Sequence, residues 1–161
     1  MKDNDMTSLF DSVMTDDVNE RPAYRQAPPG DYLAMVRSAK RVVANTGTEG
    51  LELQFTLVDV LNTDGDMDGV ELAKARVRDT IWVTENNVEI SRNTVMRIMP
   101  SLRGTPWGFS TIVDELPGAE VVVQLKHVTH DRRSGEELRT PRLEVAKYFS
   151  VDWYNEKNRA A

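Results

Sequence analysis

A run of apolar residues at every second position limits what this chain can fold into. Residues 51–57 read Leu-Glu-Leu-Gln-Phe-Thr-Leu, so each large apolar side chain is followed by a polar one. Successive side chains of a β-strand point to opposite faces of the sheet, which predicts a strand with one buried and one exposed face. We therefore expect a core built largely on the faces of strands.

Residues 72–84 repeat this period with different chemistry on the polar side. If they form a strand, one face carries three cations and an indole, and the other carries small or β-branched apolar residues. The first face holds Lys74, Arg76, Arg78, Thr80 and Trp82, and the second holds Ala73, Ala75, Val77, Ile81 and Val83. Cations that attract phosphates beside a ring that stacks on bases suit a single nucleic-acid strand. The alternative is an ordinary solvated antiparallel strand, which has the same pattern.

The rest of the chain predicts five strands with a helical insert between the third and the fourth. The expected strands cover residues 32–43, 51–57, 72–84, 121–130 and 138–148. Helical spacing of apolar residues predicts a helix within 88–102, in which Pro100 would either kink the helix or start a new turn, and a short second helix is expected at 111–116. Five strands with a helix at this place have the order of the OB-fold, a partly open Greek-key barrel that binds oligonucleotides or oligosaccharides.

The negative charge of the chain is concentrated at its N-terminus. The formal net charge of the 161 residues is -6, and residues 1–20, with one cation and six acids, account for five of these charges. The remainder is nearly neutral and has room for a basic patch. Leu9, Phe10, Val13 and Met14 lie at helical spacing among the acids. This leader could dock on a partner, fold back over the basic face, or serve only as a weakly ordered solubilising tail.

Composition excludes several other classes of protein. The absence of cysteine rules out disulfides, thiolate metal sites and cysteine nucleophiles. No run approaches the about 20 apolar residues that a membrane span needs, and no secretory signal opens the chain. We therefore expect a cytoplasmic protein with no membrane partner.

Motifs that would indicate an enzyme are incomplete. The stretch Asp64-x-Asp66-x-Asp68-Gly69 repeats the start of an EF-hand calcium loop, but Ala75 stands where the closing Glu should be. His127 and His130, three apart on an expected strand, would point to opposite faces. No phosphate-binding glycine loop or nucleophile elbow is present. We expect no catalysis, no metal and no cofactor, although paired carboxylates brought together by the fold stay an open alternative.

Several of these patterns together resemble bacteriophage single-stranded-DNA-binding proteins of the OB-fold. They are Pro29-Gly30-Asp31-Tyr32, the alternating strand at 51–57, an Asp-Gly loop before a basic third strand, and the final hairpin. The resemblance covers roughly residues 28–150. It implies a protein of the bacterial host's cytoplasm that coats transient single strands in replication or recombination, and it implies phage or host proteins of those processes as partners.

One departure concerns the chain ends. The familiar bacterial single-strand binders end in an acidic tail, whereas this chain ends in residues 156–161, Glu-Lys-Asn-Arg-Ala-Ala. A partner-binding tail would therefore be the acidic N-terminus. The expected division is a leader at 1–27, an OB-fold domain at 28–155 and a C-terminal tail at 156–161.

In an OB-fold, the surface of strands two and three and the loops that join strands one to two and four to five line the binding groove. Cations occur at each of these places. The candidate nucleic-acid-binding residues are Lys74, Arg76, Arg78, Trp82, Arg37, Lys40, Arg41, Lys126, Arg132, Arg133, Arg139 and Arg142.

The aromatic residues receive different expectations. Trp82 is the candidate for base stacking, and its alternative role is an edge residue packed under a loop. Trp107 and Phe109 are expected to pack in the core under the helical insert. The C-terminal aromatics, residues 148, 149, 153 and 154, could dock on the barrel or pair with a second subunit, and oligomeric state stays open.

The expected function is sequence-independent binding of single-stranded DNA. The alternative is a protein-interaction or assembly module that presents the barrel surface to another protein and attaches through the acidic leader.

Overall fold

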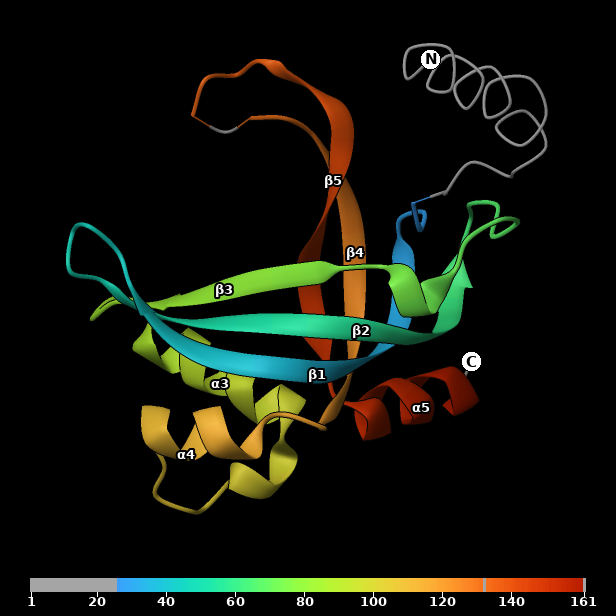
Figure 1. Cartoon of the computed structure of the whole chain (residues 1–161). Coiled ribbons are helices and arrows are strands. Elements are labelled where there is room, and N and C mark those ends of the chain that lie inside the picture. Colours follow the sequence, from blue (N-terminus) through green and yellow to red (C-terminus); the bar gives the residue numbers. More distant parts are fainter. Residues whose placement is uncertain (1–25, 132, 161) are drawn as a thin grey trace, which may run out of the picture.

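Five strands form one antiparallel sheet in the computed structural model, which describes residues 26–131 and 133–160 (Figure 1). The strands are β1 (Gly30–Val43), β2 (Glu49–Thr63), β3 (Val77–Val83), β4 (Glu120–His130) and β5 (Glu137–Phe149). Their order across the sheet is β3-β2-β1-β4-β5. The mainly β class is therefore confirmed, as is the number of long strands. Residues 1–25 of the leader predicted at 1–27 lie outside the described residues, whereas Ala27 is buried in the core and so belongs to the folded domain.

The helical insert between the third and fourth strands is also confirmed. It comprises α3 (Val88–Ile98), the 3₁₀ turn η3 (Pro100–Leu102) and α4 (Phe109–Glu115), which lie below β1 and β2 in Figure 1. The first helix ends before Pro100, which starts the next turn, one of the two effects expected of this proline. Proline lacks the amide hydrogen that an inner helical position needs, so the helix does not continue through it.

The core lies between the inner face of the sheet and this insert. All four apolar residues of the alternating pattern at 51–57 are buried, as that pattern predicts. Neighbouring strands and the insert complete the core with Tyr32, Ala34, Val36, Val121, Val123, Leu125, Ile98, Ile112 and Leu116. Trp107 and Phe109 are half-buried and pack against it, which confirms their expected role.

The predicted third strand is too long at its start. Residues 72–74 form a 3₁₀ turn, η2 (Leu72–Lys74), and the strand begins only at Val77. Lys74 therefore does not share the strand face and instead pairs with Glu71 at 2.8 Å. The two residues are three apart, a spacing that places oppositely charged side chains together on a helical turn and favours that turn over a strand.

A bulge in β1 determines which of two neighbouring cations lies on the outer face. Val36 is aligned with Phe55 of β2 and Ser38 with Gln54, so Arg37 is an extra residue in the ladder. An extra residue reverses the inside-outside alternation beyond it. Lys40 consequently shares the outer face of the sheet, whereas Arg41 lies on the side of the helical insert.

The sheet is not closed by backbone hydrogen bonds, since no ladder joins the described residues of β3 and β5. Side chains bridge the two strands instead. The Tyr148 hydroxyl of β5 donates to Asp79 Oδ2 of β3 at 2.5 Å, and the rings of Tyr148 and Phe55 lie 5.9 Å apart. We call this side-chain junction the β3–β5 seam.

The C-terminal residues form a helix that docks on the sheet. α5 (Val151–Ala160) follows β5 directly, so the expected boundary between residues 155 and 156 falls inside a helix. Tyr154 is buried, and its hydroxyl donates to Asp31 Oδ2 of β1 at 3.0 Å. Tyr154 therefore docks on the sheet, which is one of the two roles left open for the C-terminal aromatic residues. Within residues 26–131 and 133–160, no helix has the length and apolar character to span a membrane.

Candidate nucleic-acid interface

A groove of about 620 Å³ runs along the outer side of the β3–β5 seam. Arg76, Arg78 and Trp82 line it from the β3 side, and Arg142 lines it from β5. These four candidates are separated by as many as 66 positions in the sequence. The sheet brings them together because its two edge strands, β3 and β5, lie next to each other. We call this surface the β3 groove.

Trp82 is held on the outer face of the sheet by the residue beneath it. β2 aligns Gly50 with Trp82, and a Cβ built on Gly50 would lie only 2.6 Å from Cε3 of the indole. The ring therefore lies directly against the glycine backbone, in space that any side chain would fill. Trp82 nevertheless stays 41% exposed. A supported and exposed indole is the arrangement that base stacking requires.

The backbone of Trp82 is fixed as well. Asn87 Nδ2 and Ser91 Oγ, at the start of the helical insert, both donate to the Trp82 carbonyl oxygen, at 3.1 Å and 3.2 Å. Asn87 Oδ1 in turn accepts the amide hydrogen of Thr84. The end of β3 is thus tied to α3, and the indole has a rigid attachment.

Polar side chains continue the outer face from β3 across β2 to β1. One row aligns Thr80, Glu52 and Lys40, since directly opposed residues of antiparallel strands share a face. The next row aligns Arg78, Gln54 and Ser38. Lys40 therefore lies on the same outer face, with Glu52 of β2 between it and the groove. Arg41 does not, because it pairs with Glu49 and its guanidinium lies 5.4 Å from the Phe109 ring centroid on the insert side.

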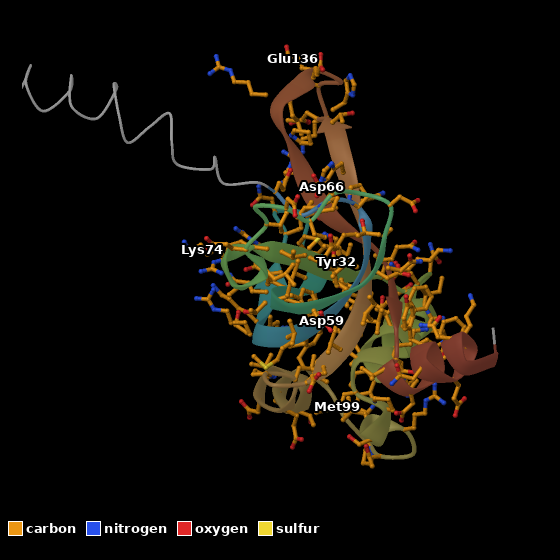
Figure 2. All side chains as sticks on the ribbon, turned by 90° about the vertical axis from the view of Figure 1, so that its right-hand side faces the viewer. Tyr32, Asp59, Asp66, Lys74, Met99 and Glu136 are labelled. Carbon is orange, nitrogen blue, oxygen red and sulfur yellow. The ribbon has the colours of Figure 1, made fainter. Side chains whose placement is uncertain are left out.

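The remaining candidates lie outside the β3 groove. Arg37 is exposed at the bulge of β1, and Lys126 is aligned with Glu144 across β4 and β5. Arg133 and Arg139 are exposed in the outer part of the β4–β5 hairpin, which projects beyond the body of the molecule in Figure 1 and carries Glu136 at its tip in Figure 2. Arg132 lies outside the described residues. The structure thus gathers some of the predicted cations and disperses the others.

Two acids in the β3 groove escaped the sequence interpretation. Asp79 and Glu144 line it beside the three arginines. The sequence does mark Asp79, because it is the one acid on the otherwise apolar face of the predicted third strand. The structure shows why an acid occurs on that face, since the buried Tyr148 hydroxyl donates to it. Burial, and secondarily the Asp79 charge, raise the pKa of Tyr148, so this hydroxyl stays protonated and donates to the carboxylate.

The turn of the β4–β5 hairpin is organised by one carboxylate. Asp131 Oδ1 accepts the amide hydrogens of Arg133 and Ser134, at 2.7 Å and 3.3 Å, and these bonds lower the pKa of Asp131. In the same half of β4, His127 Nε2 donates to the Ala27 carbonyl oxygen at 3.1 Å. His127 therefore has a structural contact that holds the chain leading into β1.

The aspartate-rich loop after β2 is arranged as a turn. Asp66 Oδ1 accepts the amide hydrogen of Asp68 at 2.9 Å, and Figure 2 shows Asp66 at the surface. In the part of the chain that the structure describes, no three His, Asp or Glu residues are grouped as metal ligands.

Comparison with known proteins yields no relative: neither the protein-family models nor the curated proteins contain a match to this chain.

Proposed function

We propose that this protein binds single-stranded DNA without sequence preference, through the β3 groove of an OB-fold. The observation that carries the proposal is the supported, exposed indole of Trp82 with Arg76, Arg78 and Arg142 along the same groove. Single-strand binding needs cations that follow the backbone and a ring on which bases stack. Both requirements occur here on one surface.

The strand order supports the assignment of the fold to the OB class. A sheet ordered β3-β2-β1-β4-β5, with a helix between its third and fourth strands, has the connectivity of that partly open barrel. OB-folds bind oligonucleotides on the surface of strands two and three, and this groove shares the third strand with that surface, its other side being formed by β5. The β3–β5 seam corresponds to the position where such a barrel would close.

The chemistry of the groove favours binding to any sequence. Guanidinium groups contact phosphates, which are the same at every nucleotide, and every base offers a ring face to Trp82. Three arginines neutralise only a few phosphates, so the salt dependence should be moderate. The resemblance noted from the sequence adds the setting, transient single strands of phage replication or recombination.

Titration of tryptophan fluorescence with an unstructured thymidine oligonucleotide, and with a duplex of equal length, tests this proposal. We expect saturable quenching by the single strand, weaker at higher salt, and little response to the duplex. No fluorescence change together with no gel shift would refute it. Strong binding to another protein that is insensitive to salt would instead favour the protein-interaction module.

The arginines can be tested separately through the salt slope. The double variant Arg76→Gln/Arg78→Gln should reduce the slope of log K against log salt by about 1.4, because each neutralised phosphate of a single strand contributes about 0.7. Arg133→Gln/Arg139→Gln, on the projecting hairpin, removes the same charge elsewhere. An equal reduction in both variants would mean that the β3 groove is not the site.

A further inference from the structure

A second groove, of about 600 Å³, lies on the other side of Tyr148. Arg97 of α3, Arg103 after η3 and Lys147 of β5 line it, together with the aromatic residues Phe149 and Trp153. Every charged residue of this lining is a cation. None of the three forms an ion pair with another described residue. We call this surface the α5 groove.

The α5 groove also offers exposed apolar surface. The rings of Phe149 and Trp153 stack with their centroids 5.0 Å apart and their planes 13° from parallel. Trp153 is 45% exposed, and Lys157 Nζ lies 5.0 Å from its ring centroid. An aromatic pair surrounded by cations fits a segment that combines carboxylates with apolar side chains.

We propose that the acidic leader of the same chain, residues 1–20, occupies the α5 groove. The leader has this combination, with six acids and the apolar residues Leu9, Phe10, Val13 and Met14. Its carboxylates complement the cations from three different elements, and its apolar side chains would cover the Phe149–Trp153 pair. The proposal concerns a surface separate from the β3 groove and does not depend on DNA binding.

The length of the chain permits this contact. The described chain begins at Gln26, which lines the β3 groove, and Tyr148 forms the wall between the two grooves by lining one and hydrogen-bonding to Asp79 of the other. Phe10 precedes Gln26 by 16 positions, which reach about 50 Å when extended. A domain of this size is roughly 35–40 Å across. Tethering also gives the leader a local concentration on the order of millimolar.

The charges of the two grooves explain why the leader should prefer this one. The β3 groove carries Asp79 and Glu144 among its arginines, so its lining is less cationic than that of the α5 groove and attracts a leader with a net charge of -5 less strongly. The α5 groove has no acid in its described lining. Nucleic acid is the other polyanion that could enter, and the experiment below distinguishes it.

The chain contains no cysteine and three tryptophans, which allows a direct test in the full-length protein. Ser8→Cys provides one attachment point for a nitroxide. The ¹⁵N-labelled indole signals then show how close the nitroxide comes to three places. Trp82 lies in the β3 groove, Trp107 packs against the core and Trp153 lies in the α5 groove. We expect at least fivefold stronger paramagnetic broadening of the Trp153 signal than of the Trp82 signal.

The matched variant Arg97→Gln/Arg103→Gln should abolish this preferential broadening while the three signals keep their dispersion, which shows an intact fold. Preferential broadening of Trp82, or equal broadening of all three signals, would overturn the proposal. A mixture of ¹⁵N protein without nitroxide and unlabelled protein with nitroxide should show no broadening. Broadening there would assign the contact to the leader of a second copy and refute the intramolecular arrangement.

A thymidine oligonucleotide separates the leader from nucleic acid as the occupant. If the leader occupies the α5 groove, the oligonucleotide should shift the Trp82 signal and leave the Trp153 broadening in place. Loss of that broadening with a concurrent shift of Trp153 would mean that nucleic acid takes the groove, contrary to the proposal. If no signal responds to DNA but Trp153 is still broadened, the leader proposal holds and the DNA-binding proposal fails.

Discussion

The two grooves on either side of Tyr148 have nearly the same volume, about 620 Å³ and about 600 Å³, and each contains an exposed indole. They differ in charge and in support. The β3 groove mixes arginines with two acids, and Trp82 rests on the backbone of Gly50 in a strand. The α5 groove has only cationic charge, and Trp153 rests on Phe149 beside the terminal helix.

If both proposals hold, positive charge alone is a poor guide to a nucleic-acid site. The more cationic groove has an indole covered on one side by another ring and approached by Lys157, whereas the less cationic one holds its indole against a flat backbone surface. A ring already fixed in place loses less conformational entropy when a base stacks on it. In our two proposals the polynucleotide binds in the β3 groove and the acidic segment in the α5 groove.

The largest difference between the two grooves is expected when the tryptophan of each is replaced by alanine and single-strand binding is compared. Stacking of a base on an aromatic ring contributes about 1–3 kcal/mol, so Trp82→Ala should weaken single-strand binding by about 5-fold to 100-fold. Trp153→Ala should change it less than about twofold on the same scale. Fluorescence anisotropy of a labelled thymidine oligonucleotide measures both, and similar losses would contradict the assignment.

A smaller effect is expected from the glycine under Trp82. Gly50→Ala places a Cβ at 2.6 Å from the indole, so the exposed ring must move off the sheet. We expect about a tenfold loss of affinity if half or more of the stacking energy depends on this position. Gly108→Ala is the matched control, because a Cβ there meets nothing within 4 Å. Unchanged affinity in Gly50→Ala would show that the observed place of the ring is not needed.

Removal of the Tyr148 hydroxyl, which lies between the two grooves, should lower the free energy of unfolding and leave DNA binding nearly unchanged. Tyr148→Phe removes the hydrogen bond to Asp79, and a bond to a charged group contributes about 1.5–3 kcal/mol. Urea unfolding at pH 7 should show a loss of this order. Tyr154→Phe, which removes the bond to Asp31, is a control for the loss of a tyrosine hydroxyl elsewhere. A loss of DNA binding in Tyr148→Phe would instead make the seam part of the site.

Tyr148→Phe should also change how the free energy of unfolding depends on pH. Since the folded pKa of Tyr148 is raised above its ordinary value of 10.0, the unfolded chain ionises first and the free energy of unfolding falls above about pH 10. Tyr148→Phe should show a shallower fall over that range. Parallel curves for the two proteins would contradict the burial of this hydroxyl.

The sequence alone was enough to predict those elements whose pattern lies within one short stretch of the chain. The alternation at 51–57 predicted a half-buried strand because burial on one face of a sheet acts on every second residue. The hairpin at 121–148 followed from two apolar runs around a turn. The insert followed from a change of period, although Pro100 fixed its end more tightly than the spacing suggested.

Features that depend on distant partners could not be predicted. The bulge at Arg37 has no sequence marker, so the sequence could not show which of Lys40 and Arg41 lies on the outer face of the sheet. Arg142 reaches the β3 groove only because the two ends of the sheet meet. The α5 groove was missed entirely, since Arg97, Arg103 and Lys147 lie in different elements and share no period.

The β3–β5 seam differs from the other strand contacts of the sheet in what holds it together. Because side chains join its two strands, separation of β3 from β5 would break the Tyr148–Asp79 bond and the ring contact with Phe55 without breaking any backbone ladder among the described residues. It would also bring two buried rings into water, so core packing opposes it. A single substitution at Tyr148 should therefore loosen this one contact between strands while every hydrogen-bonded ladder stays intact.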